Sequence, residues 1–292
     1  MKNIIHPSAK IHPNVNIGSF NSIGKNVVID YIGNISTKNS INIGDNNIIN
    51  DNTRIFVKGN LNIGDWNVFH NDMLIMAENY ISIEHNCWFG QNTILDGTGG
   101  LKIGSGVRVG MYSQVWTHVG SGELIEGCTL FSKNETIINN EVWLVGSCVV
   151  GSGIELGKRS VYLINSLITK NTLPDTTYSG SPVKIMKNLH FYKPINLNKK
   201  FDLLKGWLID FCELNQLKLI NSESDLTILD DLNKDKVIFT IRSTSNFDGS
   251  VFFLNNKTFF KTNSYLERKV YKFLYGNKKI LLIKIKLKIM KF

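Results

Sequence analysis

Residues 83–118, IEHNCWFGQNTILDGTGGLKIGSGVRVGMYSQVWTH, carry the pattern that decides the fold. Apolar side chains recur at every sixth position of this stretch, interrupted once by a short insertion: Ile83, Phe89, Leu95, Ile103, Val109 and Val115. A strand repeats every two residues and a helix every 3.6, so a period of six fits neither. The pattern indicates a hexapeptide repeat, in which each hexad forms one short strand and one turn of a prism-shaped solenoid.

The same period extends well beyond this stretch in both directions. It starts at Ile11, slips in phase, and ends in a regular final block: Ile138, Leu144, Val150, Leu156, Tyr162 and Ile168. Three hexads are expected to form one triangular coil, whose repeated apolar side chains point inward and stack on their equivalents one coil away. Residues 119–136 break the period, so we expect a loop that leaves the solenoid there. Pro174 and Pro182 are expected to end the repeat.

The sequence after residue 190 is different in kind. Residues 201–216 place their apolar side chains on one helical face, and residues 237–241 and 251–254 are typical of strands. Ser264 and Glu267 match a capping box that opens a second helix. This mixture predicts a small α+β domain.

The chain is therefore expected to form two domains, a solenoid over residues 1–189 and an α+β domain over residues 190–292. Near its end the chain alternates isoleucine or leucine with lysine over residues 283–289. The alternation predicts an edge strand whose lysines discourage pairing with another sheet. A cationic contact with anionic lipid or polysaccharide is the alternative.

Composition narrows the class of protein. The chain has 292 residues, with 33 Lys and Arg against 24 Asp and Glu, and its net charge of +9 favours anionic partners. The four cysteines form no C-x-x-C pair, which predicts a reducing compartment without a disulfide or zinc framework. The N-terminus has no apolar leader, and no apolar run approaches the roughly 20 residues of a membrane span. We expect a cytoplasmic protein, at most peripheral to a membrane.

His118 is the strongest candidate for chemistry among the six histidines. It lies where a regular coil gives way to the expected loop, and Trp116 and Thr117 beside it are placed to wall a cleft. The alternative is a turn histidine that hydrogen-bonds a carbonyl group. We favour that structural role for His6 and His12.

Three stretches carry a family resemblance: residues 89–118, residues 139–170 (NNEVWLVGSCVVGSGIELGKRSVYLINSLITK) and residues 179–187 (SGSPVKIMK). They resemble the hexapeptide-repeat acyltransferases, which fold as left-handed parallel β-helices. The likeness is greatest to the sugar O-acetyltransferases that modify bacterial surface polysaccharides. The resemblance covers roughly residues 10–188 and is most specific over the last sixty of them.

The resemblance implies a homotrimer that binds acetyl-CoA in the groove between neighbouring prisms. It implies that His118 is the general base, because histidine titrates near neutral pH and can take the proton of an acceptor hydroxyl. The backbone N–H of Gly146 in the adjacent subunit would stabilise the oxyanion. This direct transfer needs neither a cysteine nucleophile nor a metal, and nucleic acid is not an expected partner.

The same resemblance assigns further residues to binding. The residues expected at the acceptor are Gln91, Asp96 and Trp116. Because Asp96 and Trp116 occupy equivalent positions one coil apart, their side chains should lie near each other. The residues expected at the cofactor are Trp143, Gly146, Ser147, Ser166, Lys170 and Lys184. Two departures from the family pattern, Val145 and Tyr162-Leu163, put larger residues where the cofactor groove is expected.

The leading prediction is an acetyl-CoA-dependent O-acetyltransferase acting on a sugar hydroxyl of a bacterial surface glycan, such as capsule or lipopolysaccharide, or of its precursor. An N-acetyltransferase for a nucleotide-linked amino sugar is the first alternative, because such relatives share nearly all these motifs. A non-catalytic solenoid and a solenoid metal enzyme are further alternatives. The metal enzyme needs three converging histidines, and the spacing of His70, His85 and His118 disfavours it.

Overall fold

A computed structural model describes residues 2–33, 39–120, 122–232, 234–243 and 248–276, together with the backbone of residues 284–287. The chain divides into two compact units, Met1–Tyr192 and Lys193–Phe292, so the division falls at residue 192 where the sequence predicts 189. Each unit is described by itself.

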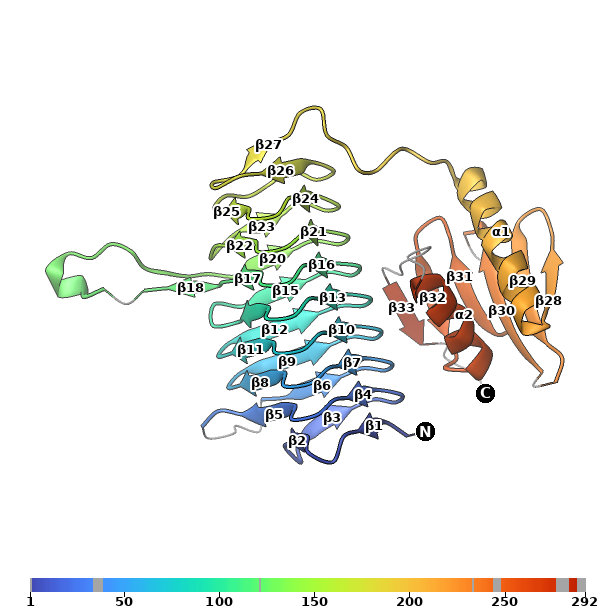
Figure 1. The fold of residues 1–292 in the computed structure, drawn as a ribbon, viewed down its shortest axis with the longest axis horizontal. Coiled ribbons are helices and arrows are strands. Elements are labelled where there is room, and N and C mark those ends of the chain that lie inside the picture. Colours follow the sequence, from blue (N-terminus) through green and yellow to red (C-terminus); the bar gives the residue numbers. More distant parts are fainter. Residues whose placement is uncertain are drawn as a thin grey trace. The chain divides into compact units, whose positions relative to one another are not determined.

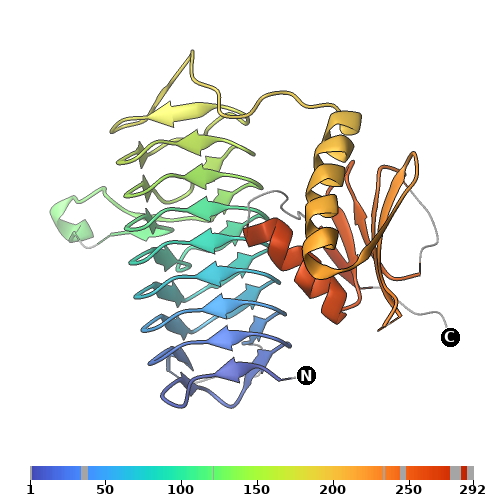
Figure 2. The same ribbon diagram turned by 45° about the vertical axis from the view of Figure 1, so that its right-hand side comes forward.

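The first unit is a stack of triangular coils built from three sheets (Figures 1 and 2). Sheet A contains β1 (Ile4–Ile5), β4 (Ser22–Ile23), β7 (Ile48–Ile49), β10 (Val68–Phe69), β13 (Trp88–Phe89), β16 (Arg108–Val109), β21 (Trp143–Leu144), β24 (Val161–Tyr162), β26 (Thr177–Ser179) and β27 (Lys184–Ile185). Sheet B contains β2 (Lys10–Ile11), β5 (Val28–Tyr31), β8 (Arg54–Val57), β11 (Leu74–Ala77), β14 (Ile94–Asp96), β17 (Gln114–Val115), β22 (Val149–Val150) and β25 (Leu167–Ile168). Sheet C contains β3 (Val15–Ile17), β6 (Ile41–Ile43), β9 (Asn60–Ile63), β12 (Tyr80–Ile83), β15 (Leu101–Ile103), β20 (Thr136–Ile138) and β23 (Glu155–Leu156).

Each coil runs from sheet A to sheet B to sheet C, and neighbouring coils pair in parallel. For example, Leu95 of β14 pairs with Val115 of β17, one coil later. Among the described strands of these three sheets, only the last, β27, runs antiparallel to its neighbour, β26. The predicted fold class, a left-handed parallel β-helix followed by a small α+β domain, is confirmed.

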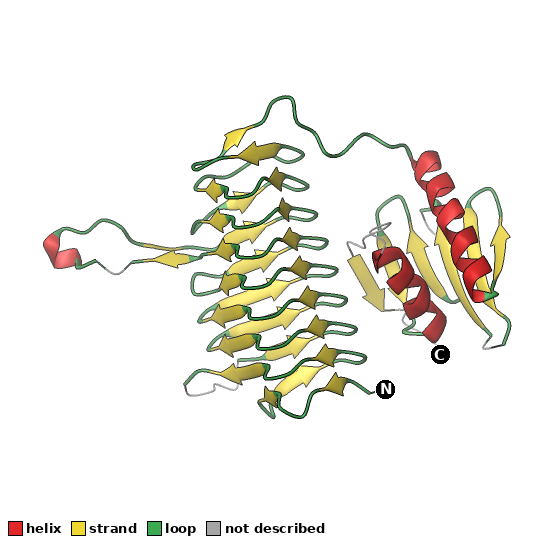
Figure 3. Cartoon of the chain, viewed as in Figure 1, coloured by secondary structure: helices red, strands yellow, loops and turns green. Residues whose placement is uncertain are grey.

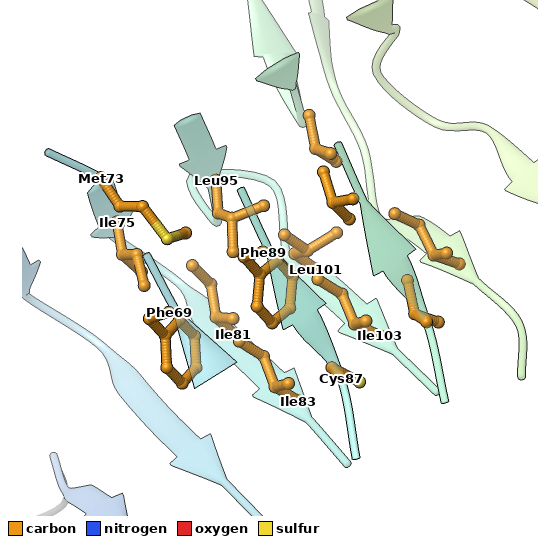
Figure 4. Packing of buried hydrophobic residues seen from close by; sticks show 14 of the residues in the cluster. Phe69, Met73, Ile75, Ile81, Ile83, Cys87, Phe89, Leu95, Leu101 and Ile103 are labelled. Atoms are coloured by element: carbon orange, nitrogen blue, oxygen red, sulfur yellow. The ribbon is translucent and has the colours of Figure 1, made fainter. Parts of the chain in front are cut away.

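The interior of the prism is filled by the side chains that the six-residue period marks. Ile83, Phe89, Leu95, Ile103, Val109 and Val115 are all at most 2% exposed. Equivalent residues stack along the prism, as Phe69 and Phe89 do with ring centroids 5.0 Å apart (Figure 4). Through these stacked contacts, the apolar side chains of each coil are buried only against the coils next to it.

Tyr162 corrects one sequence-based expectation. Its side chain is fully buried and stacks on Tyr178 inside the prism, with ring centroids 5.3 Å apart. Its hydroxyl accepts a hydrogen bond from Ser160 Oγ at 3.0 Å and bonds the Thr172 hydroxyl. The phenol is therefore a core residue with a satisfied polar end, and its side chain does not project into an outer groove.

A tight approach between coils gives a stability test at Gly110. A Cβ added there would lie 1.9 Å from the carbonyl oxygen of Val145 in the next coil, whereas a Cβ at Gly151 would meet its nearest atom at 3.4 Å. We expect Gly110→Ala to lower the free energy of unfolding by about 1–3 kcal/mol. Gly151→Ala is the matched control. Urea unfolding of both variants checks this, and equal midpoints would contradict it.

The chain leaves the prism after His118, at the corner between sheets B and C, as the loss of period predicts, and it rejoins sheet C at Thr136, the first residue of β20. Between these points it forms an arm that projects away from the coils (Figure 1). Its base is a short antiparallel ribbon, β18 (His118–Val119) with β19 (Ser132–Lys133), and its tip holds the 3-10 turn Leu124–Glu126. Ile125 and Phe131 are 91% and 66% exposed.

The second unit is an α+β fold, as predicted (Figure 3). Its elements in chain order are α1 (Leu197–Asn215), β28 (Lys218–Asn221), β29 (Asp225–Asp230), β30 (Asp235–Thr240), β31 (Ser250–Phe253), β32 (Thr258–Lys261), α2 (Tyr265–Gly276) and β33 (Lys284–Leu287). The six strands form one sheet in chain order. Helix α1 begins four residues before the predicted start, because the Asn196 side chain accepts a hydrogen bond from the N–H of Lys199 and caps the helix.

The predicted capping box opens helix α2. Ser264 Oγ accepts a hydrogen bond from the N–H of Glu267 at 3.1 Å, and the Glu267 carboxylate accepts one from the N–H of Asn263 at 3.0 Å. Strand β33 lies at the edge of the sheet beside β32, as the alternating tail predicts. The lysine side chains of that tail lie outside the described residues. The described helices include none with the length and apolarity for a membrane span.

Candidate active site

The imidazole of His118 is paired with a buried carboxylate. Nδ1 of His118 lies 2.8 Å from Oδ2 of Asp96, 22 residues earlier in the chain. The Asp96 side chain is fully buried, whereas that of His118 is 40% exposed. Nδ1 of the imidazole is therefore anchored, while the side chain as a whole remains partly exposed.

Asp96 makes five hydrogen bonds. Its Oδ1 accepts from the N–H and the hydroxyl of Thr98, at 3.1 and 2.7 Å. Its Oδ2 accepts from the N–H and the hydroxyl of Thr117, at 2.8 and 2.6 Å, and pairs with His118. Burial by itself would raise the pKa of Asp96, but these hydrogen bonds from Thr117, Thr98 and His118 outweigh it and lower the pKa below its usual value.

The register of sheet B builds this cluster. Asp96 ends β14 and follows the buried Leu95, which pairs with Val115, so the residues after Val115 lie beside Asp96 one coil later. The corner that carries Asp96 is tightly packed. A Cβ at Gly99 would lie 2.3 Å from the carbonyl oxygen of Thr117, so only glycine fits there. This close approach lets the N–H of Gly99 donate to the Thr117 hydroxyl at 2.8 Å.

Trp116 also lies beside His118, with ring centroids 6.3 Å apart and the ring planes at 69°. Its indole N–H donates to Oε1 of Gln114 at 3.1 Å, which orients the ring. On the other side, Lys133 of β19 pairs with His118 across the base of the arm. Nζ of Lys133 lies 3.6 Å from Oε2 of Glu78, and both side chains are about half exposed. Asp96 and Trp116 thus each lie beside His118, the first through a hydrogen bond and the second through its ring.

Gln91 lies elsewhere on the prism. It belongs to the turn between β13 of sheet A and β14 of sheet B, whereas His118 follows β17 at the corner between sheets B and C. A strand of sheet B separates the two corners. A single chain therefore does not bring Gln91 and His118 together.

The residues expected to bind the cofactor divide between two places. Trp143 is 38% exposed on the outer face of sheet A, where its ring meets Phe191 with centroids 6.4 Å apart. Gly146 and Ser147 form the turn between sheets A and B, and the N–H of Ser147 donates to the carbonyl of Met111 at 2.9 Å. Within the described chain, the Gly146 N–H makes no hydrogen bond.

The remaining three residues expected at the cofactor differ in their solvent exposure. Ser166 is buried, and its hydroxyl donates to the carbonyl of Leu163 at 2.6 Å, so this side chain is already used within the prism. Lys170 and Lys184 are exposed. Lys170 follows β25 at the same corner as His118, two coils further along, and adjacent coils are about 4.8 Å apart.

Two other histidines and two of the cysteines have structural surroundings. His70 packs against Trp88 with ring centroids 4.9 Å apart, and burial lowers its pKa. Nδ1 of His85 accepts a hydrogen bond from the N–H of Asp65 at 2.9 Å. Burial raises the pKa of the Cys87 thiol to about 12 and also raises that of Cys148, which leaves both thiols unreactive. The described residues contain no group of three His, Cys, Asp or Glu side chains placed to hold a metal ion.

Sequence reasoning missed Thr98 and undervalued Thr117. Both hydroxyls bind Asp96, and neither stands out in a chain rich in turn residues. The spacing Asp-x-Thr over residues 96–98 is the available signal, because an aspartate often accepts hydrogen bonds from the residue two positions on.

Comparisons with known proteins are consistent with the resemblance found in the sequence. No family model matches the chain. A probable macrolide acetyltransferase of Lysinibacillus sphaericus is 28% identical over 95 residues, which are 32% of this chain and 51% of that protein. The chain thus spans about half the length of this curated relative.

Several solved structures are similar to this chain at low identity. The polysialic acid O-acetyltransferase OatWY is 18% identical, with 68% of this chain and 92% of that chain covered and a TM-score of 0.42. A hexapeptide-repeat acetyltransferase of Vibrio cholerae, solved with acetyl-CoA, is 16% identical over 62% of this chain and 73% of that chain, with a TM-score of 0.34. The predicted resemblance to hexapeptide-repeat acetyltransferases is confirmed as a similarity.

Proposed function

We propose that this protein is an acetyl-CoA-dependent O-acetyltransferase that acts on a sugar hydroxyl of a bacterial surface glycan or its precursor. The observation that carries the proposal is the His118–Asp96 pair, because it anchors a half-exposed imidazole at the rim of the prism. A buried carboxylate behind an accessible imidazole is a general arrangement for taking a proton from a hydroxyl group. The curated relative, itself named a probable macrolide acetyltransferase, supports the reaction type.

In the proposed reaction, Nε2 of His118 takes the hydroxyl proton while the hydroxyl oxygen attacks the thioester carbonyl carbon. The carbon–sulfur bond then breaks, and the thiolate of CoA recovers the proton from the imidazolium. The products are an acetyl ester and CoA, so His118 returns to its starting state and no acyl-enzyme forms. Trp116 beside the imidazole is the proposed wall of the acceptor pocket.

We further propose that the site is completed by a second copy of the chain, in a homotrimer. The uncommitted N–H of Gly146 suits an oxyanion donor, yet Gly146 and His118 lie at opposite ends of sheet B strands. The six residues of a sheet B hexad between these two corners span up to roughly 20 Å at the usual rise per strand residue. A neighbouring prism is therefore needed to bring a Gly146 amide and Gln91 to His118.

Cofactor binding is proposed for the exposed members of the expected set. Lys170 lies at the corner of His118 and is suited to the phosphates of CoA, and Trp143 offers an exposed aromatic face. Lys184 and the Ser147 turn complete the proposed path. Ser166 contributes only its backbone, because its hydroxyl is held by Leu163. An acetyl-CoA-dependent enzyme of this kind would work in the cytoplasm.

The first test is calorimetric titration of acetyl-CoA and CoA into the wild type, His118→Ala and Lys170→Gln. We expect His118→Ala to bind both ligands as the wild type does, because the imidazole acts on the acceptor. We expect Lys170→Gln to weaken binding by about fivefold, the effect of losing one exposed ion pair. Lys10→Gln, which removes an exposed lysine from the first coil, is the matched control.

Absence of CoA binding in the wild type would overturn the proposal in favour of a non-catalytic solenoid. An N-acetyltransferase for a nucleotide-linked amino sugar is the second candidate, since the same His118–Asp96 pair serves an amine acceptor equally well. The two differ in their product. Mild base releases acetate from an ester and leaves an amide intact, so base treatment of acetylated glycan decides between them.

A further inference from the structure

The hydrogen bonds around Asp96 determine its charge state. Four donors besides His118 meet this carboxylate, namely the N–H and hydroxyl groups of Thr98 and Thr117. A backbone N–H can only donate. The Thr117 hydroxyl accepts from the N–H of Gly99, so its own proton is directed to Asp96. Asp96 is therefore acceptor-only, which is the pattern of an ionised carboxylate.

An acceptor-only carboxylate in turn determines the tautomer of His118. With Oδ2 only 2.8 Å away, a bare Nδ1 would place two lone pairs against each other. The stable arrangement puts the proton on Nδ1, where it donates to Asp96. Nε2 is then the nitrogen with a free lone pair, on a side chain that is 40% exposed.

We propose that Thr98 and Thr117 are positioning residues that act through Asp96: their hydroxyls clamp the carboxylate so that His118 is held as the Nδ1–H tautomer with Nε2 as the base. In this proposal Asp96 holds His118, whereas the sequence had suggested that Asp96 binds the acceptor substrate. Only the consequence for turnover rests on the proposed acetyl transfer. The tautomer and its clamp belong to the folded chain and can be measured without a substrate.

The clamp predicts a difference between hydroxyl and methyl at positions 98 and 117. Valine keeps the shape of threonine and removes the hydroxyl, whereas serine keeps the hydroxyl. Thr93→Val is the matched control, because Thr93 is buried in the same coil but its hydroxyl donates to the carbonyl of Gly90 at 2.7 Å. We expect the loss of either hydroxyl to lower, by about tenfold, the equilibrium constant for the state in which His118 is hydrogen-bonded to Asp96.

The experiment is nitrogen-15 NMR of the full chain labelled at histidine, with the His118 signals assigned by their loss in His118→Ala. We expect the wild type to show the Nδ1–H tautomer and an Nδ1 proton that exchanges slowly with water. Exchange of that proton should be about tenfold faster in Thr117→Val and Thr98→Val. Thr117→Ser, Thr98→Ser and Thr93→Val should match the wild type.

Two results would overturn the proposal. One is a wild-type His118 protonated on Nε2, which needs no variant to fold. The other is an Nδ1 proton that exchanges in both valine variants at the same rate as in the wild type. A wild type with the expected tautomer but without acetyl transfer would overturn the proposed function and leave the clamp standing. Where transfer is measurable, Thr117→Val should lower kcat by about tenfold with KM little changed, as expected for a residue that orients the base.

Discussion

Replacing His118 with alanine is expected to lower kcat for acetyl transfer by about 10²–10⁴-fold, the usual contribution of a general base. The reason is that His118 combines a buried carboxylate partner with a partly exposed imidazole. The variant should fold normally, because His118 is 40% exposed and lies at the edge of the prism. The measurement is steady-state release of CoA with a glycan acceptor.

His190→Ala is the control for loss of a histidine, because His190 is exposed and lies outside the repeat. It should retain the wild-type rate. A His118→Ala variant that turns over within a factor of two of the wild type would remove His118 from the mechanism and would direct attention to another proton acceptor.

Replacing Asp96 with alanine is expected to lower the free energy of unfolding by about 2–4 kcal/mol. The variant leaves the N–H groups of Thr98 and Thr117 without their acceptor in a buried corner, and each such loss costs about 1–3 kcal/mol. Asp96→Asn should cost less, since its amide oxygen still accepts. Both variants should lower kcat, because the imidazole loses its anchor.

The stability that Asp96 contributes depends on pH in a definite direction. Its pKa in the folded chain lies below its usual value of about 3.9, so folding favours the ionised form. The contribution is therefore complete above about pH 4 and is lost as pH falls through the lowered pKa. The difference in stability between the wild type and Asp96→Asn should shrink from pH 7 to pH 3.

Urea unfolding followed by tryptophan fluorescence measures both effects, because four of the five tryptophans lie in the first unit. Asp72→Asn is the control, since Asp72 is an exposed turn residue, and it should change stability by no more than about 0.5 kcal/mol. An Asp96→Asn deficit that persists unchanged at pH 3 would contradict the charge-based account.

The sequence predicted the prism because one apolar residue in six must be inside it. The same period also predicted where the prism is interrupted, since residues 119–136 lack it and the projecting arm ends before Thr136, where β20 begins. That interruption directs attention to His118, because this histidine is the last residue of the regular coil. In the second unit, the capping box of Ser264 and Glu267 predicted the start of α2, because a cap is a local hydrogen-bond pattern.

Other features depended on contacts that a period does not encode. Tyr162 occupies an inward position, and its size suggested a changed outer groove, yet the ring stacks inside the prism on Tyr178. Gln91 matched the expected motif but lies at another corner from His118. A motif gives only the order of residues along the chain. The corner of the prism at which a residue lies depends on which two sheets its turn connects.

What the sequence by itself determined is the prism, its interruption and the position of His118, because each follows from a repeat of six and its loss. Only the tertiary structure decided that Asp96, 22 residues earlier, is buried against His118 and accepts from two threonines. The physical reason is that hydrogen bonds between coils depend on the register of neighbouring strands and on a corner tight enough to require Gly99.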